Sequence, residues 1–333
     1  MRLKDIGEDR VIKDLARRFA PEDTRLIKGI GDDASVTPGK KGQVLLATTD
    51  ILIDGVHFKT SYTPARLLGR KAVSISLSDI AAMGGEPGFF LVSLGLPPNT
   101  EKVFLDELYM GMGSVARAHG ALLAGGNISR APMVLVSVTI FGQMSAKRVV
   151  YRSGARPGED IYVTGTLGDS ALGLKTLREQ GSSALKKGPF RRAVKKHLDP
   201  VARVDPGRRL SEKGLASAMM DLSDGLLLDL KRLCEASRVG AAVEAARLPL
   251  SADMRRYSKV AGKGGARRMA LTGGEDYELL FTAPPEKRRP IARLAKRLGL
   301  EITRIGTVTP KGIGVRDELG VPVKVGVPGF EHF

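Results

Sequence analysis

The sequence predicts an α/β protein of two domains, in which mixed sheets carry helices on one face. Three observations lead to this prediction. With 333 residues, 42% of them hydrophobic, the chain is long enough to bury two cores. Segments with helical spacing of apolar residues stand between segments with strand-like patterns. Gly and Pro interrupt this order at 151–158, after which it starts again, so we expect domains at residues 1–149 and 150–333.

The elements expected in the first half do not follow a strict βαβ repeat. Ile12, Leu15 and Phe19 recur at helical spacing, and residues 133–141 alternate as a long strand does. The expected elements are a helix at 5–19, a strand at 44–49 that ends at Asp50, helices at 64–84 and 101–118, and a strand at 133–141. The order strand, helix, helix, strand predicts a mixed sheet with its helices on one face.

The second half starts with another strand and again alternates. Leu226, Leu230 and Leu233 form one side of a helix that ends at Gly240. The expected elements are a strand at 160–164, a helix from Ala171, the helix with these leucines, a strand at 277–283 and a helix at 291–298. Strands at 302–308 and at 313–325, the latter with a turn at 317–320, close the fold. Two α/β domains of similar size result.

The charge of the chain is strongly positive, with a formal net value of +17. Residues 1–150 hold 19 Lys and Arg against 15 Asp and Glu, whereas the rest holds 34 against 21. A nucleic-acid backbone would be attracted to such runs. However, aromatic residues make up 5% of the chain and do not alternate with the basic runs, so no stacking platform is indicated. We expect no nucleic-acid partner, and a solvated surface that attracts anionic substrates.

Cysteine content and hydropathy bear on the compartment. Cys234 is the one cysteine of the sequence, so an internal disulfide and a Cys-based zinc site are not expected. The first residues lack the apolar run of a signal peptide, and no stretch approaches the roughly 20 apolar residues of a membrane span. These features predict a cytoplasmic protein with no membrane partner.

Many carboxylates of this basic chain stand among apolar or glycine residues. There a charge is costly unless a cation or hydrogen-bond donors meet it. The segments concerned are 29–35, 48–58, 76–85, 221–226 and 273–281. Several such segments in one chain suggest a shared site for a hard cation. Mg²⁺ takes oxygen ligands and commonly joins carboxylates to substrate phosphates.

Each of these segments also has a purely structural interpretation. Asp79 is either a helix N-cap or a metal ligand, and Ser223 or Asp224 could cap the helix that follows. A helix N-terminus also binds phosphate, so capping and ligand binding are compatible. His57 has no companion pattern, and is either structural or a hydrogen-bond donor to a phosphate.

Paired glycines before Asn127 would let the backbone approach a nucleotide closely. The P-loop pattern GxxxxGK[ST] does not occur in the sequence. We therefore expect any nucleotide to be bound without a P-loop.

Eight short segments, spread over nearly the whole chain, stand together in one order. They are GIGDDAS, TTDILIDGVHF, KAVSISLSDIAAMGGEP, GGNISR, RSGARPGEDIYVTGTLGDSALGL, DLSDGLLLDL, GGEDYELLFT and GFEHF. In this order they resemble the thiamine-monophosphate kinase family, of the aminoimidazole-ribonucleotide synthetase superfamily. The resemblance implies two PurM-like domains and a homodimer that meets through its N-terminal sheets. It also implies transfer of the γ-phosphoryl group of ATP to thiamine phosphate, giving thiamine diphosphate and ADP.

The resemblance further implies a set of residues for each part of the site. Several Mg²⁺ ions would be held by Asp33, Thr48, Thr49, Asp50, Asp79, Asn127, Asp221 and Asp224. ATP, as co-substrate, would contact Gly126, Asn127, Arg152 and Ser223. Thiamine monophosphate would contact His57, Glu275 and Phe330. Phe330 could instead only anchor the tail. No covalent catalytic residue is expected, because metal-assisted phosphoryl transfer needs positioning and charge neutralisation.

Asn127 is the one position where a difference from the family pattern matters, because Asp is common there. An amide oxygen can ligate Mg²⁺ but brings no negative charge, so we expect weaker metal binding. An inactive interaction protein is a further alternative. Related families fit less well. Selenophosphate synthetases commonly carry a reactive Cys or Sec near the N-terminus, and hydrogenase-maturation dehydratases end in Cys, whereas this sequence ends in Phe333.

Overall fold

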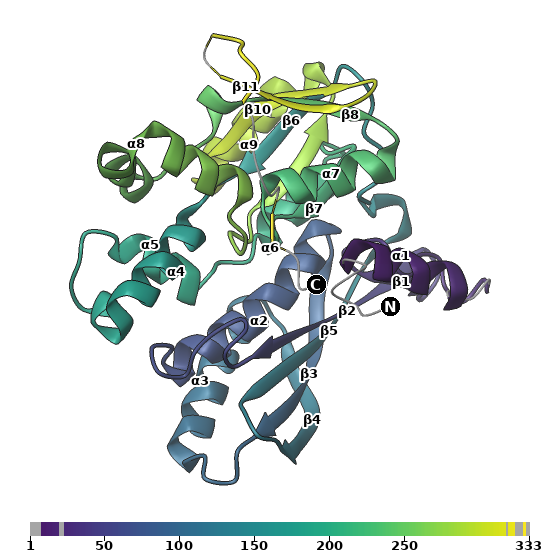
Figure 1. The fold of residues 1–333 in the computed structure, drawn as a ribbon. Coiled ribbons are helices and arrows are strands. Elements are labelled where there is room, and N and C mark those ends of the chain that lie inside the picture. Colours follow the sequence, from purple (N-terminus) through teal and green to yellow (C-terminus); the bar gives the residue numbers. More distant parts are fainter. Residues whose placement is uncertain (1–7, 20–22, 318, 324–328, 331–333) are drawn as a thin grey trace.

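The computed structural model describes residues 8–19, 23–317, 319–323 and 329–330, which fold around two sheets (Figure 1). One sheet comes from the first half of the chain and the other from the second half. Both are mixed and both carry helices, so the predicted α/β class is confirmed. The domain boundary between residues 149 and 150 stays a prediction.

The N-terminal sheet has the strand order β1-β2-β5-β3-β4. Its strands are β1 (Ser35–Pro38), β2 (Gln43–Ile53), β3 (Glu86–Leu96), β4 (Leu122–Arg130) and β5 (Leu135–Ser145). β3 and β4 are parallel, and the other neighbours are antiparallel. Helices α2 (Ala65–Ala82) and α3 (Lys102–Ala118) cover one face (Figure 1). Because side chains alternate along a strand, Leu46 of β2 is buried toward α2 while Leu45 is exposed on the other, outer face.

The expected order of strand, helix, helix, strand is wrong. β3 lies between the two helices, and β4 lies between α3 and β5. Pro and Gly interrupt the apolar pattern of β3, and two glycines interrupt that of β4, so the sequence pattern did not reveal these strands. The fold requires glycine at position 126, because a Cβ there would lie 1.9 Å from the carbonyl oxygen of Val92 on β3.

The C-terminal sheet has the order β11-β8-β10-β6-β9-β7. Its strands are β6 (Asp160–Thr164), β7 (Ala218–Asp221), β8 (Gly240–Glu244), β9 (Leu279–Ala283), β10 (Ile302–Thr309) and β11 (Ile313–Arg316). β8 and β11 are parallel, and the remaining pairs are antiparallel. The strand expected from Ile313 ends at Arg316, before the expected turn at 317–320, where Gly320 N–H donates to the carbonyl oxygen of Asp317. Residues 318 and 324–325 lie outside the described residues.

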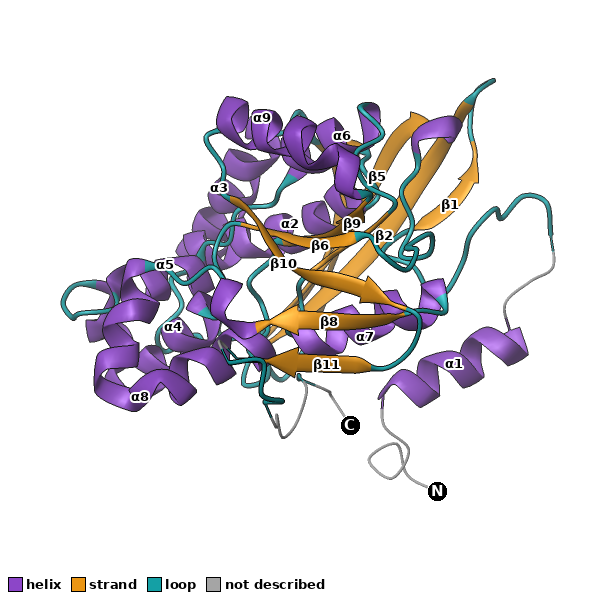
Figure 2. Ribbon diagram, turned by 90° about the horizontal axis from the view of Figure 1, so that it is seen from above, coloured by secondary structure: helices purple, strands orange, loops and turns teal. Residues whose placement is uncertain are grey.

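Of the other helices, α7 and α9 pack against this sheet, and α4, α5 and α8 form a group at one side of the molecule (Figure 2). The other helices are α1 (Glu8–Phe19), α4 (Asp169–Gln180), α5 (Arg191–Leu198), α6 (Val204–Glu212), α7 (Leu226–Ser237), α8 (Ala252–Thr272) and α9 (Arg288–Leu298). Short 3-10 turns occupy Ala146–Arg148, Gly181–Leu185, Ala245–Arg247 and Pro285–Lys287. Leu226, Leu230 and Leu233 are buried on α7, as predicted. No helix in the described ranges is long and apolar enough to span a membrane.

Helix α2 joins the two halves. It packs against β2 and β5 on one side and against α6 and β7 on the other. The same hydrophobic core contains Leu77 of α2, Met219 of β7 and Phe281 of β9. The contact with α6 is close, because a Cβ on Gly207 would lie 2.1 Å from the carbonyl oxygen of Ala81. Residues of α2 are therefore held in a fixed position relative to both sheets.

Candidate functional site

Three carboxylates from distant parts of the chain converge where the two halves meet. Oxygen atoms of Asp33, Asp79 and Asp221 all lie within 4.8 Å of one another. Asp33 precedes β1, Asp79 lies on α2, and Asp221 ends β7. Asp33 and Asp221 are buried, and Asp79 is half-buried. All three belong to the predicted set of metal ligands, and the fold brings these three together from both halves of the chain.

The electrostatics of this cluster fit a bound cation. Burial and neighbouring carboxylates raise the pKa of Asp79 and of Asp221 well above the usual value. Asp33 Oδ2 is buried and has no hydrogen-bond partner in the described chain. Carboxylate oxygens in this arrangement repel one another until a positive charge joins them, and hard cations such as Mg²⁺ prefer such ligands. The donor set therefore suits Mg²⁺.

Hydroxyl groups orient the acidic side chains. Thr48 Oγ1 donates to Asp79 Oδ2 at 2.5 Å, and Thr48 and Asp50 share the face of β2 that looks toward α2. Ser76 donates to Asp50 at 2.8 Å, and Ser78 donates to Asp221 at 2.6 Å. Burial also raises the pKa of Asp50. We missed the two serines in the sequence, although serines that alternate with apolar residues next to Asp79 were a usable signal.

Asp79 is not a helix N-cap, because it lies near the end of α2 rather than at its start. The capping interpretation is also wrong for Ser223 and Asp224, since no side chain caps α7 at Gly225. Instead Asp229, inside the helix, accepts hydrogen bonds from the backbone N–H groups of Asp224 and Gly225 at 3.0 and 3.1 Å. The side chain of Asp224 forms an ion pair with Arg232.

Arg152 lies directly beside the carboxylate cluster. Its guanidinium donates to Asp33 Oδ1 at 3.0 Å, and its backbone N–H donates to Asp32 Oδ1 at 3.2 Å. The side chain is about one-fifth exposed, and its buried Nε has no hydrogen-bond partner in the described chain. This position agrees with the predicted contact to a nucleotide phosphate, which stays a prediction.

Glu275 occupies a strained loop between α8 and β9. Its φ is +63° and that of Tyr277 is +49°, in the left-handed region that favours glycine. Its backbone N–H donates to the carbonyl oxygen of Ser223 at 2.6 Å. Its carboxylate pairs with Lys71 of α2 at 3.0 Å and with His197 of α5 at 3.2 Å. Sequence reasoning assigned no role to either partner, since neither lies near Glu275 in the chain.

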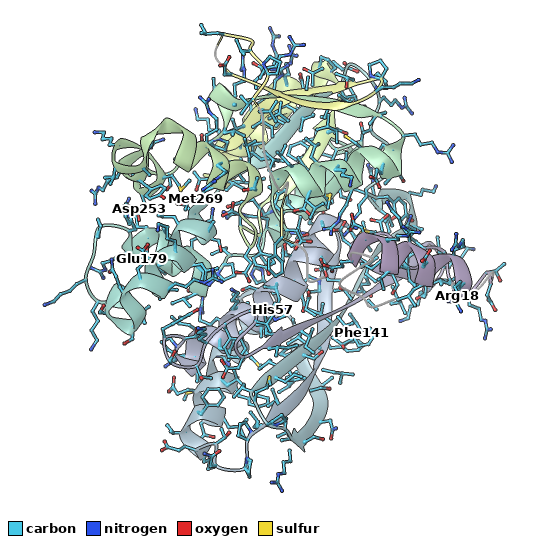
Figure 3. The ribbon with its side chains drawn as sticks, viewed as in Figure 1. Arg18, His57, Phe141, Glu179, Asp253 and Met269 are labelled. Atoms are coloured by element: carbon cyan, nitrogen blue, oxygen red, sulfur yellow. The ribbon has the colours of Figure 1, made fainter. Side chains whose placement is uncertain are left out.

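The tail and the turn after β2 carry the other two residues expected to contact the substrate. Phe330 is half-exposed, and its backbone N–H donates to the carbonyl oxygen of Asp224 at 3.0 Å. Tail and acidic loop therefore touch, which leaves both interpretations of Phe330 open. His57 follows β2, near the level where the halves meet (Figure 3). Its Nδ1 accepts a hydrogen bond from the backbone of Ile53 at 3.1 Å.

Thr49 and Asn127 do not join the carboxylate cluster within one chain. The hydroxyl of Thr49 pairs with that of Thr139 at 2.9 Å, on the outer face of the sheet. Asn127 is exposed on the edge strand β4, in register with Ser93. With β4 three strands from β2, the two positions are separated by roughly 14 Å. Their assignment as ligands, with that of Gly126 to ATP, stays a prediction.

Comparison with known proteins identifies the family. The models for the N-terminal and C-terminal domains of AIR synthase related protein match residues 31–144 and 156–318. The chain is 37% identical to the thiamine-monophosphate kinase of Aquifex aeolicus, with full coverage of both, and 37% identical to that of Escherichia coli, over 92% of this chain and 91% of the relative. The solved structure of AaThiL complexed with AMPPCP and TMP matches with a TM-score of 0.87, at 36% identity over 100% of this chain and 99% of that one. The chain therefore belongs to the thiamine-monophosphate kinase family.

Proposed function

We propose that this protein transfers the γ-phosphoryl group of ATP to thiamine monophosphate, giving thiamine diphosphate and ADP. Two lines of support converge. Full-length relatives carry this activity in their names, and a close structural relative was solved with AMPPCP and TMP. The observation that carries the proposal is the meeting of Asp33, Asp79 and Asp221, because joining two phosphorylated molecules requires charge neutralisation at one point.

We infer that Asp33, Asp79 and Asp221 hold Mg²⁺, together with Thr48 and Asp50 at the edge of the cluster. Mg²⁺ bound there would neutralise phosphate charge from both substrates. Ser76 and Ser78 fix the orientation of two of the carboxylates. Arg152 adds the positive charge of a side chain that is held in place by Asp33.

Transfer is direct in this proposal. A terminal phosphate oxygen of thiamine monophosphate attacks the γ-phosphorus, the bond to the bridging oxygen breaks, and ADP leaves. The groups that could form a phosphoenzyme are poorly suited. Burial raises the pKa of the Cys234 thiol to about 11, so it is not a thiolate at neutral pH. His197 is buried and its Nδ1 contacts Glu275.

Binding roles follow from the positions of the remaining residues. Arg152 and Ser223 would contact ATP, since both adjoin the acidic loops of the cluster. Glu275 and Phe330 would contact thiamine monophosphate, because both touch the segment Ser223–Asp224 from the side of the C-terminal sheet. His57 would serve the same substrate.

We also propose a cytoplasmic homodimer. A single buried free thiol agrees with a reducing compartment. The outer face of the N-terminal sheet exposes Leu45, Ile51, Phe89 and Leu122, an apolar surface that a second copy would cover. Such a copy would also cover Thr49 and Asn127, which share this face.

Incubation with ATP, Mg²⁺ and thiamine monophosphate, followed by chromatographic detection of thiamine diphosphate, tests the activity. Omission of Mg²⁺ or of the acceptor is the control. To test the direct mechanism, the enzyme is incubated with γ-labelled ATP alone. We expect no label on the protein, whereas stoichiometric label that is chased into thiamine diphosphate would contradict direct transfer.

A further inference from the structure

The carboxylate of Glu275 is fixed by side chains from two distant helices. Lys71 Nζ lies 3.0 Å from one carboxylate oxygen, and His197 Nδ1 lies 3.2 Å from the other. The backbone of Glu275 is fixed separately, through its hydrogen bond to Ser223. Main chain and side chain are thus both held, and the side chain still keeps 23% of its surface exposed.

Lys71 is an unusual residue for the middle of a packed helix, because it is 1% exposed. Apart from this ion pair, its ammonium has no partner in the described chain. Burying an ammonium is costly without a matched anion. Burial raises the pKa of Glu275, but the charge and hydrogen bonding of Lys71 and His197 lower it by more, so that the pKa lies far below its usual range. The pair is therefore charged on both sides and has little net charge.

His197 acts as a neutral donor in this arrangement. Burial and the nearby Lys71 lower its pKa, so the ring is uncharged at neutral pH. Its Nδ1 lies near the Glu275 carboxylate and also 2.9 Å from Ser170 Oγ. The carboxylate can only accept, so this contact is attractive in the tautomer that carries the ring proton on Nδ1. Ser170 is the second residue of α4, so His197 also connects the loop to that helix.

The backbone of this loop is strained, with positive φ at Glu275 and Tyr277. Left-handed conformations of residues other than glycine are strained, and persist where the surroundings impose them. At Glu275 the ion pair with Lys71, the contact with the His197 imidazole and the backbone hydrogen bond to Ser223 together impose the left-handed conformation. Positioned carboxylates in strained loops are typical of binding sites.

We infer that Lys71 and His197 are positioning residues, which aim the Glu275 carboxylate so that it accepts an N–H from the acceptor substrate. This inference rests on the proposed function and makes it more specific. A carboxylate offers about four acceptor sites, of which Lys71 and His197 use two. The free sites suit the amino group on the pyrimidine of thiamine monophosphate. The cationic thiazolium ring of the substrate would be attracted only weakly to Glu275, because Lys71 already balances the negative charge of this carboxylate.

Helix α2 sets the distance between this contact and the metal cluster. Lys71 and Asp79 are eight residues apart on one helix, which corresponds to about 12 Å along its axis. A molecule with an amino group at one end and a phosphate at the other would span this separation. The same rigid element thus positions both ends of the acceptor.

The test compares thiamine monophosphate with its analogue that lacks the pyrimidine amino group. Kinetics are measured for the wild-type enzyme, for Lys71→Met and His197→Leu, and for the conservative Lys71→Arg and His197→Gln. Lys102→Met, an exposed lysine in an ion pair on α3, is the matched control. Direct calorimetric titration of both compounds into the wild-type protein gives the same comparison without variants, and thermal melts report folding.

We expect the wild-type enzyme to prefer thiamine monophosphate over the analogue by roughly 10- to 100-fold in kcat/KM. Lys71→Met and His197→Leu should remove most of this preference, mainly through KM for thiamine monophosphate. The KM for ATP and the rate with the analogue should change less than about twofold. His197→Gln, which keeps an N–H donor, should retain much of the preference.

Equal losses for both compounds, or a wild-type enzyme that binds both equally well, would overturn the inference. Failure of the wild-type enzyme to phosphorylate thiamine monophosphate at all is a separate result. It would contradict the proposed function, and the calorimetric ratio would still decide whether Glu275 recognises the amino group.

Discussion

Asp221 shows at the scale of one residue how a binding site costs stability. It is buried beside Asp33 and Asp79, and burial with the neighbouring charge raises its pKa well above the usual value. Ionised Asp221 therefore destabilises the metal-free fold. The hydroxyl of Ser78 offsets only part of this cost.

Asp221→Asn should accordingly raise the free energy of unfolding in metal-free buffer by about 1 kcal/mol, because a buried charge is removed while Ser78 keeps an acceptor. It should also lower kcat by roughly 100-fold or more. Chemical denaturation with and without Mg²⁺ and steady-state kinetics measure both effects. Asp205→Asn, at an exposed position on α6, is the control. A destabilised metal-free variant would contradict this account.

The residues that the sequence could and could not reveal differ in a physical way. The convergence of Asp33, Asp79 and Asp221 could be anticipated, since a carboxylate in apolar surroundings needs a cation or hydrogen-bond donors wherever the fold places it. Lys71 and His197 were not, because their roles exist only through contact with Glu275, which is distant in the sequence. The outer-face position of Thr49 depends on strand pleating, which the sequence of β2 does not fix.

At the scale of elements, helix α4 begins at a carboxylate from another segment. Asp276 accepts hydrogen bonds from the backbone N–H groups of Gly168 and Ser170, at 2.6 and 3.2 Å. A carboxylate at a helix N-terminus is favourable. Burial nevertheless raises the pKa of Asp276 to about 7, against the lowering effect of Lys196 and these N–H donors.

This gives a pH dependence with a definite sign. The pKa of Asp276 is higher in the folded state than the value near 4 of an unfolded chain, so the fold favours the protonated form. Stability from this group is present below pH 4 and is lost as pH rises toward 7. Between pH 5 and 8, the wild-type protein should therefore lose roughly 2–3 kcal/mol more than Asp276→Asn does. Urea denaturation at several pH values checks this, and equal slopes would contradict it.

Element prediction from the sequence succeeded where the apolar period was uninterrupted. α2, α3, α7 and α9 agree with the expected ranges, as do β2, β5, β6 and β9 in part. α8 was missed because it contains several glycines, and it bends at Gly262, where φ is +75°. β7 and β8 were missed because strands of four or five residues are too short to show a clear period of apolar side chains.

At the scale of the whole molecule, the outer face of the N-terminal sheet determines how the chain assembles. Phe89 is 49% exposed there and stacks on Phe141, with ring centroids 5.1 Å apart. Leu45, Ile51 and Leu122 extend this apolar surface. A patch of this kind on an open sheet is typical of an interface between subunits.

Phe89→Lys should convert the proposed dimer into a monomer, since it places a charge in the covered surface. Light scattering at micromolar concentration should give twice 35.6 kDa for the wild-type protein and one chain mass for the variant. Val103→Lys is the control, because Val103 is equally apolar and exposed but lies on α3, on the opposite side of the sheet. A wild-type mass equal to one chain would contradict the proposal.

Asn127 connects assembly to metal binding. Within one chain it lies roughly 14 Å from Thr49, too far for both to bind one ion. If the second copy brings Asn127 to the metal site of its partner, Asn127→Asp should lower the Mg²⁺ concentration for half-maximal activity several-fold, because a carboxylate replaces a neutral amide. The effect should disappear when Phe89→Lys is added, and persist when Val103→Lys is added. An unchanged magnesium dependence of Asn127→Asp in the dimer would instead confine Asn127 to contact with the nucleotide, and metal binding would then depend on the carboxylates of a single chain.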